Sequence, residues 1–489
     1  MNHRKISMLL AAILCVSSAA SCGGAADTGS DTTTTAPAVT DPADLREPCG
    51  VPADLDLGGE TINIWCTVGA HKILNTEQTG DVLDDVIYNA NVAVQERLNC
   101  VFNYVDSGFG SSTDTAAIST LLLADDTSYD LYLPVQWSGG KLVAERLYLN
   151  VANAPYISFD KPWWDVDYMR EMSVGNDKIF TLVGDYSRHR TEMLNCIYYN
   201  KSLYDDFYKD PDGLYQTVLD GDWTLDKYHE ICETVFLDMD GDGAASLGDR
   251  LGAIQCWNGP TMAMLYCSEL RITERDKDGI PYLAMKSEKN FDIIEAVYEV
   301  ARHTTGIFFG QEKEAITGGY QDENFIGDKT MFYYGSLGSS NTLRDMTSDY
   351  GIVPYPKYDK NQKNYHSMIG ETMTFAALPY NCQKVDAVCA MLEQLAWEGY
   401  HEVLPVYYEL VLKTKYARDD ISAQMIDIIR DNMVTDIALI YGSGFGNLCY
   451  EPRALIKSGS GDFASVYASK ETAAITASEK LIEQFTSMD

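Results

Sequence analysis

The stretch ETINIWC at residues 60–66 decides the fold class, because it is a short apolar run behind two glycines and so predicts a buried strand. A helix is predicted over 81–98, where apolar residues recur about once per turn and aspartates lie at the start. Strands at 100–104 and 129–135, with a helix at 115–124 between them, continue the alternation. This order is typical of a parallel α/β sheet, in which ligands bind beyond the carboxyl ends of the strands.

Length and composition exclude several classes of protein. The chain has 489 residues, of which 46% are hydrophobic and 22% charged, so it is not a disordered chain, a collagen or a disulfide mini-protein. Its 37 Lys and Arg residues face 72 Asp and Glu residues, which gives a formal net charge of −35. A nucleic-acid partner is not expected, because binding to phosphates requires a basic surface.

The N-terminus has the pattern of an export signal. Two basic residues precede an apolar run at 6–16, which is too short to span a membrane permanently. The sequence AASC at 19–22 then resembles the lipobox of bacterial lipoproteins, in which the cysteine becomes the acylated first residue of the mature chain. Residues 1–21 are therefore predicted to be a lipoprotein signal peptide, with Cys22 as the lipidation site. Plain secretion with cleavage near Ala20 is the alternative.

Residues 22–57 are predicted to form a flexible, lipid-anchored linker. From 23 to 50 the sequence is rich in Gly, Ala, Thr, Asp, Ser and Pro and contains no aromatic residue. Such a composition cannot bury enough apolar surface to offset the entropy of the chain. A tether of this kind lets a folded domain move above the membrane to which one end is fixed.

Five landmarks, in the right order, resemble the extracellular solute-binding proteins of ABC importers, of the type that includes maltose-binding protein. They are DLYL at 130–133 followed by WSGG at 137–140, NDKIFTL at 176–182 with IYYNK at 197–201, DWTLDK at 222–227, FIGDKTM at 325–331, and YGIVPYP at 350–356. The resemblance implies a two-lobed periplasmic-binding-protein-like (type II) α/β fold with hinge-crossing segments. Lobe 1 would comprise 58–190 plus 371–414, and lobe 2 would comprise 191–370 plus 415–489.

The same resemblance implies which residues line the cleft between the lobes. Aromatic faces and a few polar groups suit sugars, whose C–H bonds stack on rings while their hydroxyls need hydrogen-bond partners. The candidate ligand-binding residues are Trp65, Gln136, Trp137, Arg188, Arg190, Trp257, Tyr334, Ser336, Glu371, Tyr441 and Asn447. The two arginines would either meet an acidic ligand or pair with neighbouring carboxylates. The aromatic platform that sugar-binding relatives place after the 325–331 motif falls near Leu337, so it is absent or moved here.

One motif predicts a calcium site without any resemblance to a family. Oxygen-bearing residues recur over 238–249 with the spacing of an EF-hand-like loop, and Gly243 permits its sharp turn. The predicted metal ligands are Asp238, Asp240, Asp242, the carbonyl of Ala244, Ser246 and Asp249. The alternative is an acidic turn in a very acidic protein, and either way the site would be structural. The sequence DKDG at 276–279 lacks the rest of the pattern and predicts a hairpin turn.

The sequence contains no known catalytic motif. GxSxG, a Walker P-loop, HExxH and GxGxxG after a strand are all missing, so we expect no enzyme. The cysteines lack the CxxC spacing of zinc or redox sites, and no disulfide is predicted. Structural Ca²⁺ is the one cofactor that the sequence predicts.

The sequence thus predicts a lipid-anchored receptor on the extracellular face of the cytoplasmic membrane. It would capture a carbohydrate, most simply an oligosaccharide, and deliver it to an ABC transporter permease, as a monomer held at the membrane by its lipid alone. Closure of the lobes on the ligand would be its mechanism. A surface polysaccharide-binding protein or adhesin without a transporter, and a secreted hydrolase, are the alternatives.

Overall fold

The computed structural model describes residues 46–70, 74–310, 319–413 and 420–488. The chain divides into two units, Met1–Pro48 and Cys49–Asp489, and every element below belongs to the second. The predicted signal peptide, Cys22 and most of the predicted linker lie outside the described residues. Within the described ranges, no helix is both long and apolar enough to cross a membrane.

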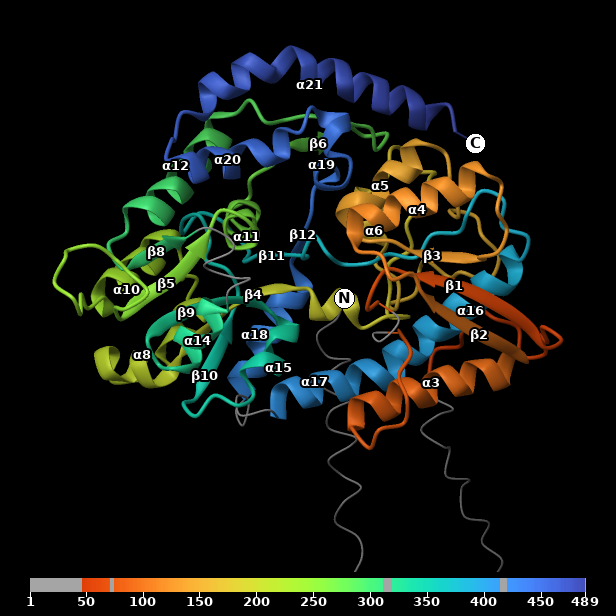
Figure 1. Ribbon diagram of the computed structural model, residues 1–489, viewed down its shortest axis with the longest axis horizontal. Coiled ribbons are helices and arrows are strands. Elements are labelled where there is room, and N and C mark those ends of the chain that lie inside the picture. The colour runs from red at the N-terminus through yellow and green to blue at the C-terminus, as the bar shows by residue number, and fades with distance from the viewer. Residues whose placement is uncertain (1–45, 71–73, 311–318, 414–419, 489) are drawn as a thin grey trace, which may run out of the picture. The chain divides into compact units, whose positions relative to one another are not determined.

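The first sheet consists of three parallel strands in the order β2-β1-β3. β1 (Glu60–Cys66) pairs with β2 (Cys100–Asp106) along its whole length and with β3 (Leu131–Leu133) near its carboxyl end. α3 (Val82–Leu98) connects the first two strands and α4 (Ser111–Leu123) connects β2 to β3. Figure 1 shows α3 below this sheet and α4 above it. The predicted alternation of strands and helices is confirmed.

Local chemistry explains why α3 begins and ends where it does. The Asp81 side chain caps its first turn by accepting hydrogen bonds from the backbone N–H groups of Leu83 and Asp84. Asn99 ends the helix in the left-handed conformation, with φ of 49°. The buried face of the helix consists mainly of apolar residues at helical spacing.

The second sheet has five strands in the order β10-β4-β9-β5-β8. β5 (Leu251–Cys256) runs parallel to β8 (Ile307–Gly310) and β9 (Thr330–Ser336). β4 (Asn195–Asn200) runs antiparallel to both β9 and β10 (Tyr350–Val353). The carboxyl ends of β5, β8 and β9 therefore lie at one edge of the sheet, which is where ligands bind in α/β folds.

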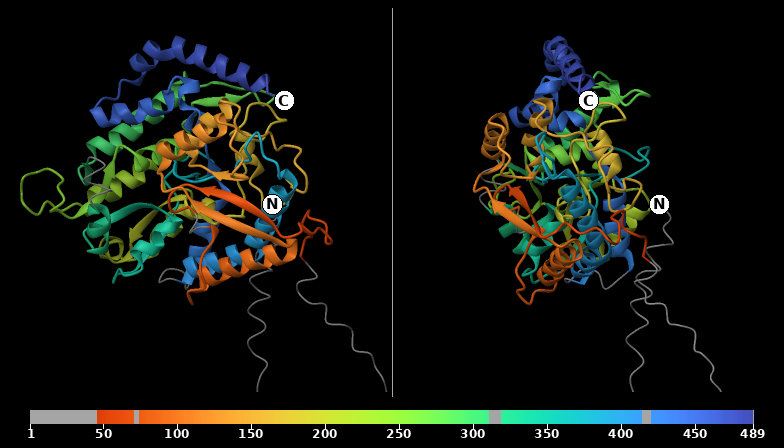
Figure 2. Two further views of the ribbon diagram at one scale, coloured as in Figure 1. Left: turned by 45° about the vertical axis from the view of Figure 1, so that its right-hand side comes forward. Right: turned by 90° about the vertical axis from the view of Figure 1, so that its right-hand side faces the viewer.

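Helices and short strands surround these two sheets. The helices are α5 (Gln136–Ala144), α6 (Val166–Glu171), α7 (His189–Glu192), α8 (Lys201–Tyr208), α9 (Gly213–Leu219), α10 (Leu225–Val235), α11 (Gly259–Cys267), α12 (Glu288–His303), α14 (Tyr320–Ile326), α15 (Ser340–Leu343), α16 (Val385–Glu398), α17 (Leu404–Lys413), α18 (Asp420–Asp431), α19 (Ile437–Ile440), α20 (Glu451–Ser458) and α21 (Phe463–Thr486). Short 3₁₀ or π segments are η2 (Leu337–Ser339), η3 (Gly399–Val403), η4 (Gly442–Phe445) and η5 (Leu448–Tyr450). α21 packs on α5, α12, α20 and η4, and Figure 2 shows it along one outer edge in both views.

The chain returns to the first sheet after crossing the second. Thr374 and Ala377 form antiparallel bridges with Val135 and Tyr132, next to β3. α16 then packs on α3. Just before this return, β11 (Ser367–Met368) pairs with β12 (Met433–Val434) in a parallel two-stranded sheet. The two sheets are thus linked by crossing segments, while the lobe boundaries given above stay a prediction.

The chain from Cys49 to Leu57 is folded, although the sequence assigned it to the linker. Val51 is buried, and the Leu57 N–H donates to the Leu98 carbonyl. The Gly50 N–H donates to Glu393 of α16 at 3.1 Å. A linker of the predicted kind would therefore end before Cys49, because the residues from Cys49 onward have apolar and polar partners far away in the sequence.

Glu393 is fully buried and accepts hydrogen bonds from four N–H groups. Besides Gly50, the donors are the Ser158 backbone at 3.1 Å and the indoles of Trp163 at 3.3 Å and Trp164 at 2.7 Å. A carboxylate without access to water is stabilised when several donors face it. We call this arrangement the Glu393 clasp.

The turn predicted at 276–279 joins β6 (Thr273–Arg275) to β7 (Pro281–Leu283) in an antiparallel hairpin, as expected. Arg275 ties the hairpin to the end of α6, because it pairs with Glu171 at 3.0 Å and donates to the Ser173 carbonyl at 2.7 Å. All ten cysteines from Cys49 to Cys449 are free thiols.

Candidate ligand-binding site

The segments that follow β3 and β5 both reach Glu371, which lies on the crossing segment before Thr374. After β3, the backbone N–H of Trp137 donates to the Glu371 carbonyl at 3.3 Å. After β5, Asn258 and Glu371 share one partner, the guanidinium of Arg453 on α20. Three of the predicted ligand-binding residues, Trp137, Trp257 and Glu371, are therefore brought together.

Arg453 is the centre of this cluster. Its Nη1 donates to Asn258 Oδ1 at 2.6 Å and lies 3.4 Å from Glu371 Oε2, and its side chain is only 14% exposed. The guanidinium also lies over two aromatic rings, 4.6 Å from the centre of Tyr450 and 5.2 Å from that of Trp257. Such contacts fix the orientation of a planar guanidinium, so that its remaining N–H groups point in defined directions.

Trp257 supplies an aromatic face beside these charges, whereas Trp137 is joined to the same cluster through its backbone N–H. Trp137, at the start of α5, is 38% exposed. Trp257 is half-buried, and Lys457 of α20 holds its ammonium group 4.0 Å from the centre of the ring. Aromatic faces next to a fixed guanidinium and a carboxylate are the combination that binds a hydroxylated ring. We call Trp137, Trp257, Glu371, Tyr450 and Arg453 the Arg453 cluster.

Sequence reasoning missed Asn258, Tyr450 and Arg453. Arg453 is 82 residues from Glu371 and 195 from Asn258 along the chain. Its local sequence shows only the start of a helix, and no signal there connects it to the ends of the strands. Asn258 could have been predicted, because it directly follows Trp257 after β5.

Other predicted ligand-binding residues have their polar groups engaged inside the protein. The Trp65 indole donates to Asp114 at 2.8 Å, and its ring stacks on Phe109. Gln136 is buried and accepts a hydrogen bond from the Tyr168 hydroxyl.

Tyr334 and Ser336 lie on β9, whereas the other two candidates, Tyr441 and Asn447, lie in the C-terminal region. Tyr334 is buried, and its hydroxyl forms hydrogen bonds with the Tyr228 hydroxyl and the Gln255 amide oxygen. The Ser336 N–H donates to the Ser339 hydroxyl at 3.0 Å. Tyr441 is buried and donates to the Met172 carbonyl at 3.2 Å. Asn447 is exposed with φ of 58°, and its carbonyl accepts from the Tyr450 N–H, which leaves it at the border of the Arg453 cluster.

Arg188 and Arg190 form ion pairs inside the protein. Arg188 pairs with Glu192 at 2.7 Å, whereas Arg190 pairs with Asp165 at 2.9 Å and Asp185 at 3.3 Å. Burial raises the pKa of Asp185 to about 6, against the effect of Arg190. Burial alone would lower the pKa of Arg190, but the two aspartates raise it. These contacts favour the pairing alternative over recognition of an acidic ligand.

His189, between these arginines, contacts the crossing segment. Its Nδ1 lies 3.1 Å from the Thr374 hydroxyl and accepts from the Thr374 N–H at 3.4 Å. Burial and the charge of Arg188 lower the pKa of His189 to about 4, so the imidazole is neutral at pH 7. A neutral ring keeps Nδ1 free to accept, which holds the segment in place.

The predicted calcium loop lies between α10 and β5, at the amino end of β5. Oxygen atoms of Asp238, Asp240 and Asp242 all lie within 4.8 Å of one another. Two ligands of one calcium ion are at most about 5 Å apart, because each Ca–O distance is about 2.3–2.6 Å. Gly243 has φ of 83°, as the sharp turn requires. These three of the six predicted ligands are thus close enough together to share one ion.

Hydrogen bonds hold the loop in this shape. Asp238 accepts from the N–H groups of Gly241 and Gly243, and these bonds lower its pKa. Asp249 accepts from Met239 at 2.7 Å and from Ser246 at 2.8 Å, which brings the two ends of the loop together. These bonds hold the loop closed and keep the three aspartates near one another.

Comparison with known proteins identifies the fold. No protein-family model matches the sequence, and a search of curated proteins finds no match. Among solved structures, the chain is similar to an ABC transporter solute-binding protein from Thermotoga lettingae bound with α-D-tagatose, with TM-score 0.54 and 12% identity over 86% of this chain and 100% of that one. It is also similar to a cyclo/maltodextrin-binding protein complexed with maltotetraose, with TM-score 0.53 and 10% identity over 88% and 98%.

A third similar structure is an ABC substrate-binding protein from Listeria monocytogenes in complex with cycloalternan, with TM-score 0.51 and 10% identity over 88% of this chain and 100% of that one. At such low identity the likeness concerns the fold alone. The predicted fold class and the predicted resemblance are both confirmed: this chain has the two-lobed α/β fold of the solute-binding proteins of ABC transporters.

Proposed function

We propose that the protein is an extracellular receptor that captures a carbohydrate, most simply an oligosaccharide, and delivers it to an ABC importer without making or breaking a bond. The observation that carries this proposal is the Arg453 cluster, where an Arg–Glu pair lies beside the Trp257 ring and the Trp137 backbone bonds to Glu371, after β5 and β3 respectively. The proteins of similar fold were solved with tagatose, maltotetraose and cycloalternan, which supports a sugar as the ligand.

Closure around the sugar is the proposed mechanism. Trp137 belongs to the segment after the first sheet, whereas Trp257 follows a strand of the second. A ligand that contacts both tryptophans binds one arrangement of the lobes more tightly than others, and so shifts the population toward it. Lipidation at Cys22 would keep this receptor at the membrane, next to the permease.

Replacing Trp257 by alanine should weaken sugar binding about thirtyfold or more, because a buried aromatic contact at the centre of a binding site contributes about 2 kcal/mol. Trp137→Ala should have a similar effect. The ligand is first found by thermal shift with a panel of mono- and oligosaccharides, amino acids and peptides, and its affinity is then measured by isothermal titration calorimetry.

Tyr320→Ala is the matched control, since Tyr320 is an aromatic residue that is 40% exposed on α14, a helix outside the cluster. The proposal would be wrong if no carbohydrate stabilised the protein, or if both tryptophan variants bound the sugar as tightly as Tyr320→Ala. Chromatography of the sugar recovered after incubation tests the hydrolase alternative, because a receptor returns it intact.

We also propose that Ca²⁺ binds the loop at 238–249 and stabilises the fold. Carboxylates whose oxygen atoms lie within 4.8 Å of one another repel when no cation lies between them, and an ion bound only by the folded state adds stability by mass action. At a hundred times its dissociation constant, calcium would contribute about 2.7 kcal/mol. Removing it with a chelator should therefore lower the melting midpoint.

Asp242→Asn should remove most of this calcium effect, because it takes a charged ligand from the centre of the loop. Asp278→Asn, in the exposed β6–β7 turn, changes the charge equally and should leave the response to calcium intact. Identical melting curves with calcium and with chelator would rule out a stabilising ion.

A further inference from the structure

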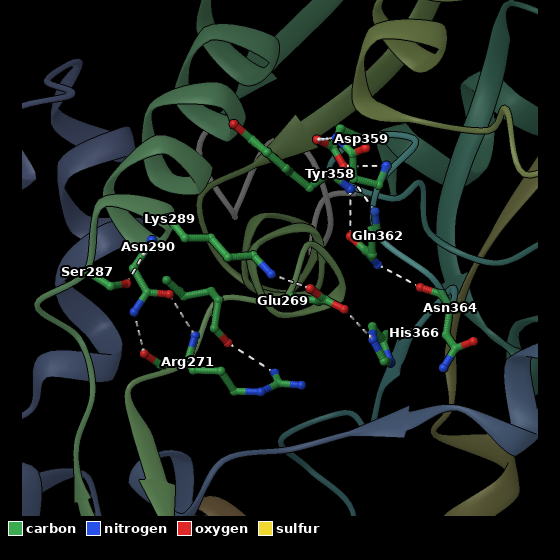
Figure 3. Close-up of polar contacts among 12 residues, drawn as sticks. Glu269, Arg271, Ser287, Lys289, Asn290, Tyr358, Asp359, Gln362, Asn364 and His366 are labelled. Atoms are coloured by element: carbon green, nitrogen blue, oxygen red, sulfur yellow. Dashed lines mark hydrogen bonds and ion pairs between the residues drawn. The ribbon is translucent and has the colours of Figure 1, made fainter.

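A second polar cavity, of about 530 Å³, lies beside α12 and the loop after β10. Its lining is Glu269, Arg271, Lys289, Tyr358, Asp359, Asn361, Gln362, Lys363, Asn364 and His366. Figure 3 shows residues from both walls, with Arg271, Lys289 and Glu269 on one side and Tyr358, Gln362 and Asn364 on the other. A volume of this size holds a small organic ligand.

The cavity is separate from the Arg453 cluster. Asn258, which contacts Arg453, precedes α11, while Glu269 and Arg271 follow it. A nine-residue α-helix is about 13 Å long, so the helix separates the two sites by roughly that distance. A ligand in the cavity would not occupy the position of a sugar at Trp257.

Buried amides hold both walls of the cavity in place. Asn290 accepts from the Arg271 N–H at 3.1 Å and donates to the Arg271 carbonyl at 2.8 Å. In the opposite wall, Gln362 accepts from the Tyr358 N–H and donates to the carbonyls of Cys267 and Asn364, at 2.8 to 2.9 Å. The lining side chains are therefore presented from fixed backbone, as in a built site.

Most charges of the lining are compensated by described residues, and the two exceptions are Arg271 and Lys363. Glu269 is shared by Lys289 and by His366, whose Nε2 lies 3.4 Å away. Asp359 accepts from the backbone of its own loop, at Asn361 and Gln362. Arg271, by contrast, makes a single hydrogen bond through its guanidinium, to the adjacent Leu270 carbonyl at 3.1 Å, and no ion pair with any described residue.

An unpaired guanidinium is notable in a chain with a net charge of −35. Arg271, Lys289 and Lys363 outnumber Glu269 and Asp359, so the lining carries one net positive charge when His366 is neutral. Burial and the charge of Arg271 lower the pKa of His366, which keeps it neutral at pH 7. The cavity thus attracts a single negative charge, and the planar guanidinium matches a carboxylate.

We propose that this cavity binds a sugar acid, a hydroxylated ring or chain that carries one carboxylate. The carboxylate pairs with Arg271, with Lys363 nearby. The hydroxyl groups bond to the exposed amide of Asn364 and donate to the amide oxygen of Asn361, whose Nδ2 donates to Asp359 at 2.8 Å. This site goes beyond the proposed function, because it needs neither the Arg453 cluster nor a transporter.

The test is isothermal titration calorimetry of the purified protein with D-glucuronate and D-galacturonate at low salt, with D-glucose as the neutral probe. We expect at least one uronate to bind and glucose to bind at least tenfold more weakly. Arg271→Gln should weaken uronate binding about tenfold or more, because it removes a charged hydrogen-bond donor. Arg344→Gln, at an exposed arginine on the same lobe, is the matched control and should bind uronate normally.

Lys363→Gln is the second variant, because Lys363 is exposed and its replacement should change stability by less than about 0.5 kcal/mol. Lys363→Gln should weaken uronate binding about threefold. Raising the salt concentration should weaken uronate binding by the unmodified protein to a similar extent. Binding that persists in Trp257→Ala assigns the uronate to this cavity. The proposal is overturned if no uronate binds, if Arg271→Gln and Arg344→Gln bind it equally, or if inorganic phosphate binds equally well.

Discussion

Replacing Glu393 by alanine should lower the free energy of unfolding by about 4–5 kcal/mol. The Glu393 clasp satisfies four N–H donors from Gly50, Ser158, Trp163 and Trp164. Each buried donor left without a partner costs about 1–3 kcal/mol, and the small side chain of alanine leaves a cavity as well. Denaturant-induced unfolding followed by tryptophan fluorescence measures the change, because two of the donors are indoles.

Glu393→Gln separates the charge from the shape of this side chain. It keeps one acceptor oxygen but turns an NH₂ group toward N–H donors, so we expect about half of the alanine effect. Glu479→Ala, at an exposed position of α21, is the control for loss of a glutamate and should change stability by less than about 0.5 kcal/mol. Equal unfolding midpoints for Glu393→Ala and Glu479→Ala would contradict the role assigned to the clasp.

Arg190→Met should lower the free energy of unfolding by about 3–5 kcal/mol at pH 8, because it leaves Asp165 and Asp185 without the guanidinium that pairs with both in a nearly buried site. The cost should shrink toward pH 5. Without Arg190, the folded-state pKa of Asp185 lies still higher than about 6, and thus above its unfolded value. Such a group contributes stability at low pH that is lost as the pH rises through the folded pKa.

Urea unfolding at pH 5, 6.5 and 8 checks this prediction, with the unmodified protein measured under the same conditions. Arg344→Met, on the exposed surface, controls for the loss of an arginine and should be nearly neutral at every pH. A penalty for Arg190→Met that grew as the pH fell would show that the aspartates are not the cause.

The fold was largely predictable because its signals are local. The strands at 60–66 and 100–106 and the helix at 82–98 follow from apolar periodicity and a capping aspartate, all within a few residues of one another. The motif behind the predicted calcium loop is equally local, since its candidate ligands lie within twelve residues, but calcium binding itself stays a prediction. The sequence did not predict that Thr374 pairs with Val135 or that Ala377 pairs with Tyr132. These antiparallel bridges join segments about 240 residues apart, so no local pattern indicates them.

The site was harder to predict, because it depends on distant partners. Arg190 and Arg453 are both arginines in an acidic chain, and local sequence cannot tell them apart. Asp165 and Asp185 engage the first inside the protein, whereas Glu371 and Asn258 place the second between aromatic rings at the ends of strands. Trp65 was predicted to bind ligand because it lies near the end of a strand. Its indole N–H instead donates to Asp114 on α4, a partner that the local sequence of Trp65 does not indicate.

The Glu393 clasp also sets an order for biosynthesis. Gly50 and Glu393 are 343 residues apart, so their hydrogen bond cannot form until most of the chain has been synthesised. At about ten residues per second, that delay is roughly half a minute. Closing a loop of this length costs about 5 kcal/mol of chain entropy, which only the completed contacts can offset. A nascent chain that ends before residue 393 should therefore lack the contact that holds Gly50, whereas Leu57 can already bond to Leu98.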